Sequence, residues 1–476
     1  MKTKRVVYFI ILLMPCILYS CNKQLNLAPT DKLVESKVFS DATTAESALA
    51  SVYDQTYQAA TGDQWVIADV SLPYVGLPVG HPLTAFFGGL IDPTNSDVQN
   101  IWSGFYGTIN AANVFVTKIP VYGKYALSLE NQHIAEAKFI RAYCYFKMLC
   151  YYGHGALTGN MSDLGLPVRL APYDGFSQKD LIPRANNGTV YKQIIKDLTE
   201  AVPDLPSLYL NRGVTDWVKT CSRATKAAAW ALLSRVYLYK QDYANVVLAS
   251  DSVQAFSVYL IDPDLTNVFP ANHTGTNSYF SKEVIWGFPA SSNNGNSQFG
   301  IHGIFYYDKF YWADSAFVSS FNPNDKRRTQ LIFGGNPLDT NPNTKDKKTT
   351  FKFNNPDQRD DIKVIRLAEV YLNKAEALAQ LNGINNESLS LLNTIRQRAG
   401  LNPFNTGDFS SKEAFINGIL AERYVELAFE GMGRFDYMRT GRNLRNPNLT
   451  ADQKIFPIPK IEIDITNGVL QQNPGY

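Results

Sequence analysis

The 476-residue sequence lacks the short motifs that mark several common enzyme classes. It has no His-Glu-x-x-His zinc helix, no Gly-x-Ser-x-Gly nucleophile elbow and no phosphate loop of the Walker type. Its five histidines, at positions 81, 133, 154, 273 and 302, are scattered, and none pairs at metal-ligand spacing. No calcium-loop spacing is present either. We therefore expect no cofactor and no metal site, and a carboxylate pair without a motif keeps a hydrolase as an alternative.

Charge and cysteine are also sparse. Charged residues make up only 18% of the chain and form no basic run, so nothing indicates a nucleic-acid partner. Cys144 and Cys150 are six residues apart on one predicted helix, a rise of about 9 Å, which is too long for a disulfide. Cys221 stands alone, and no Cys-x-x-Cys pair occurs. We expect these three cysteines to be buried free thiols.

No apolar run is long enough to cross a membrane, which takes about 20 residues. The apolar run at residues 6–19 is shorter, contains Pro15 and follows a basic start with Lys2, Lys4 and Arg5. This arrangement predicts a secretory signal at residues 1–20. Its ending, Leu-Tyr-Ser-Cys, is similar to a bacterial lipobox, which implies cleavage before Cys21 and acylation of the Cys21 thiol. The alternative is an ordinary signal followed by a chance cysteine.

Helical periodicity dominates the rest of the chain. Apolar residues recur three and four apart in residues 364–381 and again in 388–400, with Asn382-Gly383 between them. Two such amphipathic helices cannot bury both apolar faces alone, so each needs neighbouring pairs. The same spacing predicts further helices at residues 42–57, 101–119, 136–152 and 226–256.

One helix pair resembles a tetratricopeptide repeat. Trp230, Leu233, Ser234 and Tyr237 follow the bulky, bulky, small, bulky pattern of its first helix. Generic helical packing explains the same residues, and both interpretations stay open here. In either case the fold class is mainly α: a superhelix of tetratricopeptide-like helix pairs with long irregular loops and a few short strands.

Two irregular regions, residues 60–100 and 266–355, carry many aromatic residues. Long loops inside a compact domain are commonly binding loops, and only residues 283–288 read as a strand in the second region. An aromatic ring stacked on the apolar face of a sugar, with polar groups bonding the hydroxyls, is the physics of a carbohydrate site. The alternative is that these rings belong to the core. The predicted ligand-binding residues are Phe86, Phe87, Asn95, Tyr306, Asp308, Tyr311 and Trp312.

Three glutamates recur every four residues near the C-terminus: Glu422, Glu426 and Glu430. Like charges on one helical face repel, so we expect them to meet cations. The candidate cations are Arg366, Arg396, Arg398, Arg434 and Arg439. Two close carboxylates could instead serve a glycosidase, but regular spacing along a helix favours an internal ion-pair network.

Motifs along almost the whole mature chain resemble the SusD/RagB family. They include residues 136–143 (EAKFIRAY), 366–372 (RLAEVYL), 396–400 (RQRAG), 422–442, 456–459 (FPIP) and the ending 472–476 (QNPGY). The resemblance implies a largely helical, non-enzymatic outer-membrane lipoprotein of Bacteroidetes-type bacteria. It also implies a TonB-dependent SusC-like barrel as partner, and capture of glycans or, in some members, peptides. Asn22-Lys23-Gln24 after Cys21 departs from the acidic residues that surface-displayed members usually carry there.

The resemblance also implies where a ligand binds, since family sites form from the early loop and the middle insertion. We expect four parts: a signal peptide at 1–20, an N-terminal helical part at 21–265, a loop-rich insertion at 266–355 and a C-terminal helical part at 356–476. Three functional classes remain: a glycan-binding subunit anchored in the outer membrane and facing outward, a hydrolase, and a helical-repeat scaffold that binds only protein. The sequence favours the first.

Overall fold

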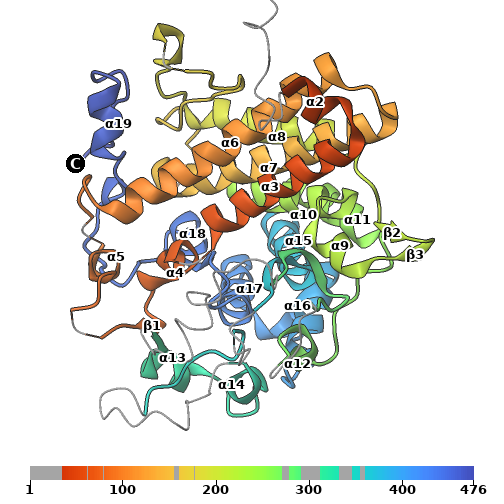
Figure 1. Cartoon of the computed structure of the whole chain (residues 1–476). Coiled ribbons are helices and arrows are strands. Elements are labelled where there is room, and N and C mark those ends of the chain that lie inside the picture. The colour runs from red at the N-terminus through yellow and green to blue at the C-terminus, as the bar shows by residue number, and fades with distance from the viewer. Residues whose placement is uncertain are drawn as a thin grey trace, which may run out of the picture.

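The computed structural model describes residues 35–61, 63–78, 80–89, 91–154, 160–175, 177–270, 278–290, 311–331, 346–353 and 360–476 (Figure 1). The predicted signal peptide and Cys21 lie outside these residues. None of the helices in the described ranges combines the length and the apolar character that crossing a membrane requires. The fold is mostly helical with a few short strands, as predicted.

The helices have the following bounds: α2 Glu35–Ser40, α3 Ala42–Ala60, α4 Asp63–Val70, α5 Thr84–Gly88, α6 Ser96–Tyr122, α7 Leu127–Tyr152, α8 Asn187–Ala201, α9 Trp217–Ser222, α10 Lys226–Tyr239, α11 Tyr243–Gln254, α12 Leu265–Val268, α13 Ser315–Ser320, α14 Arg327–Gln330, α15 Leu367–Asn382, α16 Asn386–Arg398, α17 Lys412–Glu426, α18 Gly433–Arg439 and α19 Lys460–Ile465. The strands are β1 Val75–Gly76, β2 Leu210–Asn211, β3 Val214–Thr215, β4 Val284–Phe288, β5 Trp312–Ala313 and β6 Ile362–Arg366. They pair in twos, as β1–β5, β2–β3 and β4–β6.

Long N-terminal helices form one layer of the molecule. Helices α3, α6, α7 and α8 run across the upper half of Figure 1, and α7 packs against both α6 and α8. Three of them, α3, α6 and α8, begin at side chains that cap the free backbone N–H groups of the first turn. Asp41 accepts from Thr43 N and Thr44 N at the start of α3, and Asn186 accepts from Thr189 N at the start of α8. The predicted helices in this part are confirmed, with α6 and α7 starting earlier than expected.

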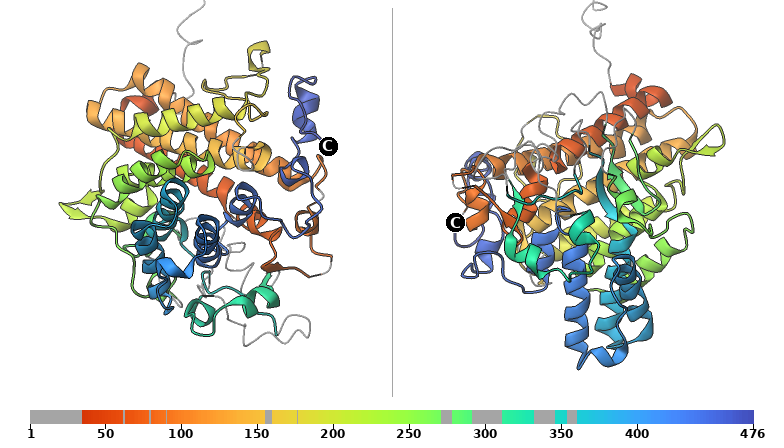
Figure 2. Two further views of the ribbon diagram at one scale, coloured as in Figure 1. Left: turned by 180° about the vertical axis from the view of Figure 1, so that it is seen from behind. Right: turned by 90° about the horizontal axis from the view of Figure 1, so that it is seen from below.

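Helix pairs form the second layer. The pairs α10/α11 and α15/α16 pack together through α11 and α15, and α17 packs on α15, an arrangement consistent with tetratricopeptide-like stacking; Figure 2 shows them from behind and below. The small residue of the predicted pattern, Ser234, is completely buried at this junction. Its hydroxyl lies 2.8 Å from Ser250 Oγ on α11 and accepts from Asn373 Nδ2 on α15 at 3.2 Å. A larger side chain at this position would separate the three helices.

The structure corrects the start of the predicted helix at residues 364–381. Residues 362–366 form strand β6, which pairs antiparallel with β4, and α15 begins only at Leu367. Three of its five residues are isoleucine or valine, which suit a buried strand. Every residue of β6 is buried, so the tertiary partner overrides the helical periodicity.

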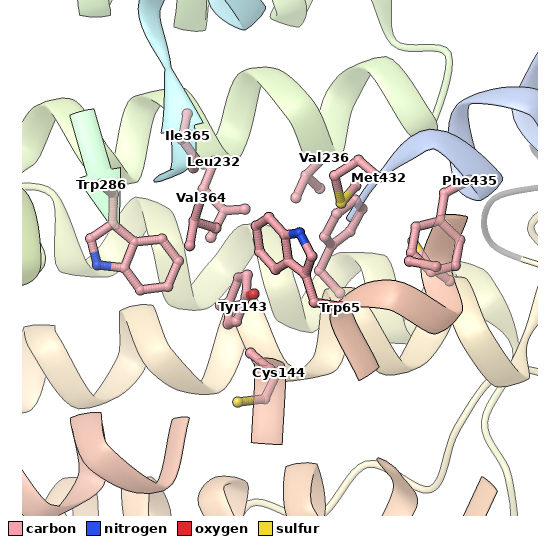
Figure 3. Close-up of a cluster of buried hydrophobic side chains, with 14 of the residues drawn as sticks. Trp65, Tyr143, Cys144, Leu232, Val236, Trp286, Val364, Ile365, Met432 and Phe435 are labelled. Carbon is pink, nitrogen blue, oxygen red and sulfur yellow. The ribbon is translucent and has the colours of Figure 1, made fainter. Parts of the chain in front are cut away.

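The hydrophobic core joins segments that are far apart in sequence (Figure 3). Trp286 of β4 is completely buried and meets Phe139 and Tyr143 of α7 edge-on, with ring centroids 4.9 and 4.8 Å apart. Trp65 of α4 donates its indole N–H to Phe429 O at 3.1 Å. The predicted strand at 283–288 is therefore confirmed as β4, and it anchors the middle of the chain to α7.

The three cysteines of the mature chain that the structure describes are free and buried, as predicted. Burial raises the pKa of the Cys150 thiol to about 12, which keeps the thiol protonated and unreactive. Residues 60–100 are less irregular than expected, because α4, α5 and the start of α6 lie within them. The apolar sequence of α4 is drawn into the core, with residues 65–70 buried.

Candidate ligand-binding site

Strands β1 and β5 bring together the two irregular regions that the sequence singled out. Val75 pairs with Ala313 and Gly76 with Trp312, in antiparallel register. Asp314 N donates to Tyr74 O at 2.8 Å, and Ala313 N donates to Lys348 O at 2.8 Å. The early loop and the middle insertion are therefore joined by backbone hydrogen bonds, beside α13 in the lower part of Figure 1.

Trp312 is the first partly exposed ring of this corner. Its indole lies directly over the backbone of Gly76, and a Cβ atom at Gly76 would overlap the indole nitrogen. The Lys347 ammonium lies 4.8 Å from the centre of the Trp312 ring, within cation–π range. The ring is thus held by a glycine and a lysine and remains half-buried.

Phe87 is the second partly exposed ring. The Arg445 guanidinium lies 4.1 Å from its ring centre. The same guanidinium donates to the carbonyl oxygens of Leu72, Pro73 and Val75 and lies 3.8 Å from Asp314 Oδ2. Burial lowers the pKa of Arg445, and Asp314 opposes that shift. Arg445 therefore links Phe87 to the β1–β5 corner, and we call Phe87, Trp312, Asp314, Lys347 and Arg445 the ring corner.

Three of the predicted site residues have packing or capping roles in the fold. Phe86 is completely buried and packs on Phe456 with ring centroids 5.3 Å apart. Tyr311 is 2% exposed and packs against His81. Asn95 caps α6 by accepting from Asp97 N and Val98 N. Neither Phe86 nor Tyr311 offers a face to a ligand, so the structure removes these two rings from the site, whereas Asn95 is partly exposed and stays a prediction.

Two other predicted residues, Tyr306 and Asp308, lie outside the described residues. Arg445, Lys347 and Asp314 were missed by the sequence analysis. Arg445 follows α18 in an irregular segment, more than 350 positions after the loop that it holds, a separation of |i−j| = 370 from Val75. No local periodicity connects residues at that distance, so only the tertiary structure could reveal the partnership.

The glutamate series forms a buried ion-pair network, as predicted. Glu426 is completely buried and pairs with Arg327, Arg366 and Arg398 at 3.1, 3.1 and 2.5 Å. Glu422 pairs with Arg327 at 2.6 Å and with Arg396 at 3.0 Å. The network includes residues that the sequence analysis did not name, because Glu283 pairs with Arg366 and Arg398 and Lys352 pairs with Glu430.

Part of that prediction was wrong. Arg434 donates to Ser71 Oγ and Lys454 O, and Arg439 pairs with Glu376 and Asp436. Helix α17 ends at Glu426, so Glu430 does not share its face and is reached by Lys352 and Arg366 from other segments. The glutamates nevertheless meet cations from all sides.

The electrostatics of the network favour a structural role. Burial alone would raise the pKa of Glu426, but Arg398, Arg366 and Arg327 outweigh burial and hold that pKa well below its usual range. A glycosidase general acid requires the opposite, a carboxyl whose pKa is raised. Among the described residues, no group of three or more His, Cys, Asp or Glu side chains is placed to hold a metal ion.

The chain thus consists of stacked helix pairs that carry two irregular regions joined by β1 and β5. Comparison with known families agrees: residues 346–452 match the model of the SusD family, and residues 31–238 match a family described as "Starch-binding associating with outer membrane". The chain therefore belongs to the SusD-like families.

Relatives agree with this assignment across the chain, and solved structures share the fold. SusD-like protein P38 of Formosa agariphila is 24% identical over 98% of each chain, and SusD-like protein P2 of the same organism is 25% identical over 80% of this chain and 81% of its own. A SusD superfamily protein from Bacteroides thetaiotaomicron superposes with a TM-score of 0.78 at 22% identity, covering 91% of this chain and 99% of its own. A SusD-like carbohydrate binding protein from Bacteroides vulgatus gives 0.71 at 20% identity, covering 85% and 84%. The predicted family and fold are thus confirmed.

Proposed function

We propose that this chain is a non-catalytic binding protein of the outer membrane that captures glycans and passes them to a SusC-like TonB-dependent transporter. The observation that carries the proposal is the ring corner, where two partly exposed rings from distant segments each lie beside a cation and are connected through Arg445 and the β1–β5 pair. Family membership supports the same conclusion, since one matching family is described as starch-binding and associated with the outer membrane.

The chemistry of the ring corner suits a sugar. A half-buried ring offers a flat apolar face that is already fixed, so a ligand loses little side-chain freedom on stacking against it. Lys347 and Arg445 can donate hydrogen bonds, and Asp314 can accept them, which satisfies hydroxyl groups around the stacked ring. Stacking thus supplies affinity, while these three side chains select the orientation of the hydroxyls.

The N-terminus supplies the membrane attachment in this proposal. Acyl chains on Cys21 hold a folded domain to a membrane without a spanning segment. The described fold starts at Glu35, so residues 22–34 connect it to the anchor. We propose from the family that the folded domain faces the outside of the cell. Because the residues after Cys21 are not acidic, surface labelling of intact cells is the measurement that tests this orientation.

A glycan array followed by calorimetric titration of each ligand found tests the proposal. The double variant Phe87→Ala and Trp312→Ala should bind an identified glycan at least ten times more weakly, because two stacked rings contribute roughly 1 kcal/mol or more each. Tyr279→Ala is the matched control, since that ring is 40% exposed and lies in the same insertion as Trp312 but before β4, outside the ring corner.

Three results would contradict parts of the proposal. Unchanged affinity in the double variant would remove the ring corner as the site. A blank array with a barrel that co-purifies would favour peptide capture or a protein-binding scaffold. Release of shortened oligosaccharides by the purified protein would show a hydrolase and overturn the non-catalytic assignment.

A further inference from the structure

A cavity of about 500 Å³ lies on another part of the molecule, on the side where α19 stands. Its floor is α6, and its walls are α19 with Leu470 beyond it and the irregular segment after α7. In Figure 1 and the left view of Figure 2, α19 and this segment rise beside each other from α6. The volume falls within the roughly 300–1,000 Å³ of small-molecule sites.

The wall formed by the irregular segment is held rigidly. Tyr106 donates its hydroxyl to Pro167 O at 2.8 Å. Tyr145 donates to Arg169 O and accepts from Arg169 N, both at 2.7 Å. Asn110 Oδ1 accepts from Tyr173 N at 2.7 Å. These bonds fix the wall before any ligand arrives, which lowers the entropy that binding would cost.

One glycine in the cavity floor is unexplained by packing. Gly107 lies inside helix α6, where glycine destabilises a helix relative to alanine. No atom lies within 4 Å of the position that its Cβ would occupy, whereas Gly104 of the same helix packs against Ala59 at 3.3 Å. The missing side chain at Gly107 keeps the cavity floor open without serving the fold.

The lining combines apolar surface with a balanced set of polar groups. Leu170, Tyr173 and Ile465 line the cavity and leave 41%, 53% and 56% of their surface exposed. The charged lining residues are two cations and two carboxylates, namely Arg169, Lys179, Asp180 and Glu462. This balance favours neither an anion nor a cation, so the ligand that fits is neutral.

Two polar groups are available to hydroxyls. Burial raises the pKa of Glu462, while Arg169 and a hydrogen bond from Trp102 oppose that shift, so its carboxyl is partly desolvated and can pair with a hydroxyl. Within the described chain, no residue accepts from the Asn110 side-chain NH₂ group, whose oxygen already holds the wall. An acceptor and a donor therefore lie in one mostly apolar cavity.

We propose that this cavity is a second ligand site, separate from the ring corner, that takes a neutral saccharide of one or two rings, stacked on Tyr173 and hydrogen-bonded by Glu462 and Asn110. Only the choice of saccharides as ligand class rests on the proposed function; the cavity, the rigid wall, the open glycine and the charge balance stand independently. A neutral saccharide could then occupy this cavity while a separate glycan chain occupies the ring corner.

Saturation-transfer NMR with maltose, cellobiose and lactose as probes tests the proposal on the full mature protein. Gly107→Phe fills the cavity from its floor, where nothing obstructs the new side chain, and should reduce saturation transfer to the probes at least fivefold while leaving the melting temperature unchanged or higher. Gln99→Leu, an exposed change on the same helix outside the cavity lining, is the control and should keep the wild-type signal. If Gly107→Phe unfolds, Tyr173→Ala takes its place. This variant removes the exposed ring, and we expect the same reduction in saturation transfer.

The double variant Phe87→Ala and Trp312→Ala separates this inference from the proposed function. Transfer that persists in the double variant and disappears in Gly107→Phe supports the cavity. Transfer that disappears in the double variant and persists in both Gly107→Phe and Tyr173→Ala overturns the cavity and leaves the ring corner standing. No transfer from any of the three probes to wild-type protein overturns the cavity as a saccharide site, while the array described above decides the ring corner on its own.

Discussion

Replacing Glu426 with glutamine should destabilise the fold strongly without affecting glycan binding. The Glu426 side chain is completely buried and lies within ion-pair distance of Arg327, Arg366 and Arg398. Glutamine keeps the shape and one acceptor oxygen but removes the negative charge. Two of these arginines would still meet Glu283, so three buried cations would share less negative charge than before.

The magnitude follows from the cost of an uncompensated buried charge. Breaking a buried ion pair by removing one partner costs about 3–5 kcal/mol. Because Glu283 and Glu422 compensate part of the loss, we expect the low end, about 3 kcal/mol in the free energy of unfolding. Glu413 lies on the same helix and is exposed, so Glu413→Gln should change stability by less than about 0.5 kcal/mol.

Urea unfolding followed by circular dichroism at several pH values measures both effects. The pKa of Glu426 is held well below its usual range in the folded state, so the unfolded chain binds the proton more readily than the folded one. The stabilisation is therefore fully present above about pH 4.3, the ordinary pKa of glutamate, and decreases as the pH falls below it. The gap between wild type and Glu426→Gln should narrow on acidification.

Three results would refute this reasoning. A Glu426→Gln protein as stable as Glu413→Gln at neutral pH would show that the network contributes no net stability. A gap that widens below pH 4 would show that the sign of the pKa shift is wrong. Loss of a glycan-cleaving activity in Glu426→Gln, with unchanged stability, would revive the carboxylates as catalytic groups.

Three further predictions concern other parts of the chain. Burial lowers the pKa of Lys147 to about 8, so the free energy of unfolding of the wild-type protein should rise between pH 8 and 10.5. In urea unfolding, Lys147→Met should abolish that rise and stabilise the protein at pH 7 by about 2–3 kcal/mol. A variant that is less stable than wild type at pH 7 would contradict this prediction. Gly76→Ala should displace the Trp312 indole and weaken glycan binding as much as Trp312→Ala, with the melting temperature lowered by only a few degrees; wild-type affinity would show that the indole is not part of the site. Cys21→Ala should move the protein from the membrane to the soluble fraction after cell lysis, and a protein that still sediments with membranes would rule out the lipid anchor.

Local sequence was sufficient wherever one helix face repeats over several turns. The helices α3, α6, α7, α10, α11 and α16 were predicted in kind, because apolar residues three and four apart report burial of one face regardless of the partner. The thiols at Cys144, Cys150 and Cys221 were likewise predicted as buried, since their spacing and surroundings exclude a bridge. Family motifs extended these local signals to the fold class.

Short elements needed the tertiary structure. Residues 364–366 continue the period of α15 in the sequence, yet they form a strand because β4 supplies a partner. Phe86 and Phe87 are adjacent on α5, and consecutive helical residues point about 100° apart. One ring therefore had to face inward, and only the packing of Phe456 decided that it is Phe86.

The sequence by itself determined that the chain is mainly helical and that its glutamates meet arginines. Which residues meet was decided only by the folded chain: Arg445 reaches the loop that holds Phe87, and Arg327, Lys352 and Glu283 join the network around Glu426. Periodicity records how much of a side chain is buried, because burial repeats with the helix. It does not record the identity of a partner from another segment, which depends on how the layers pack.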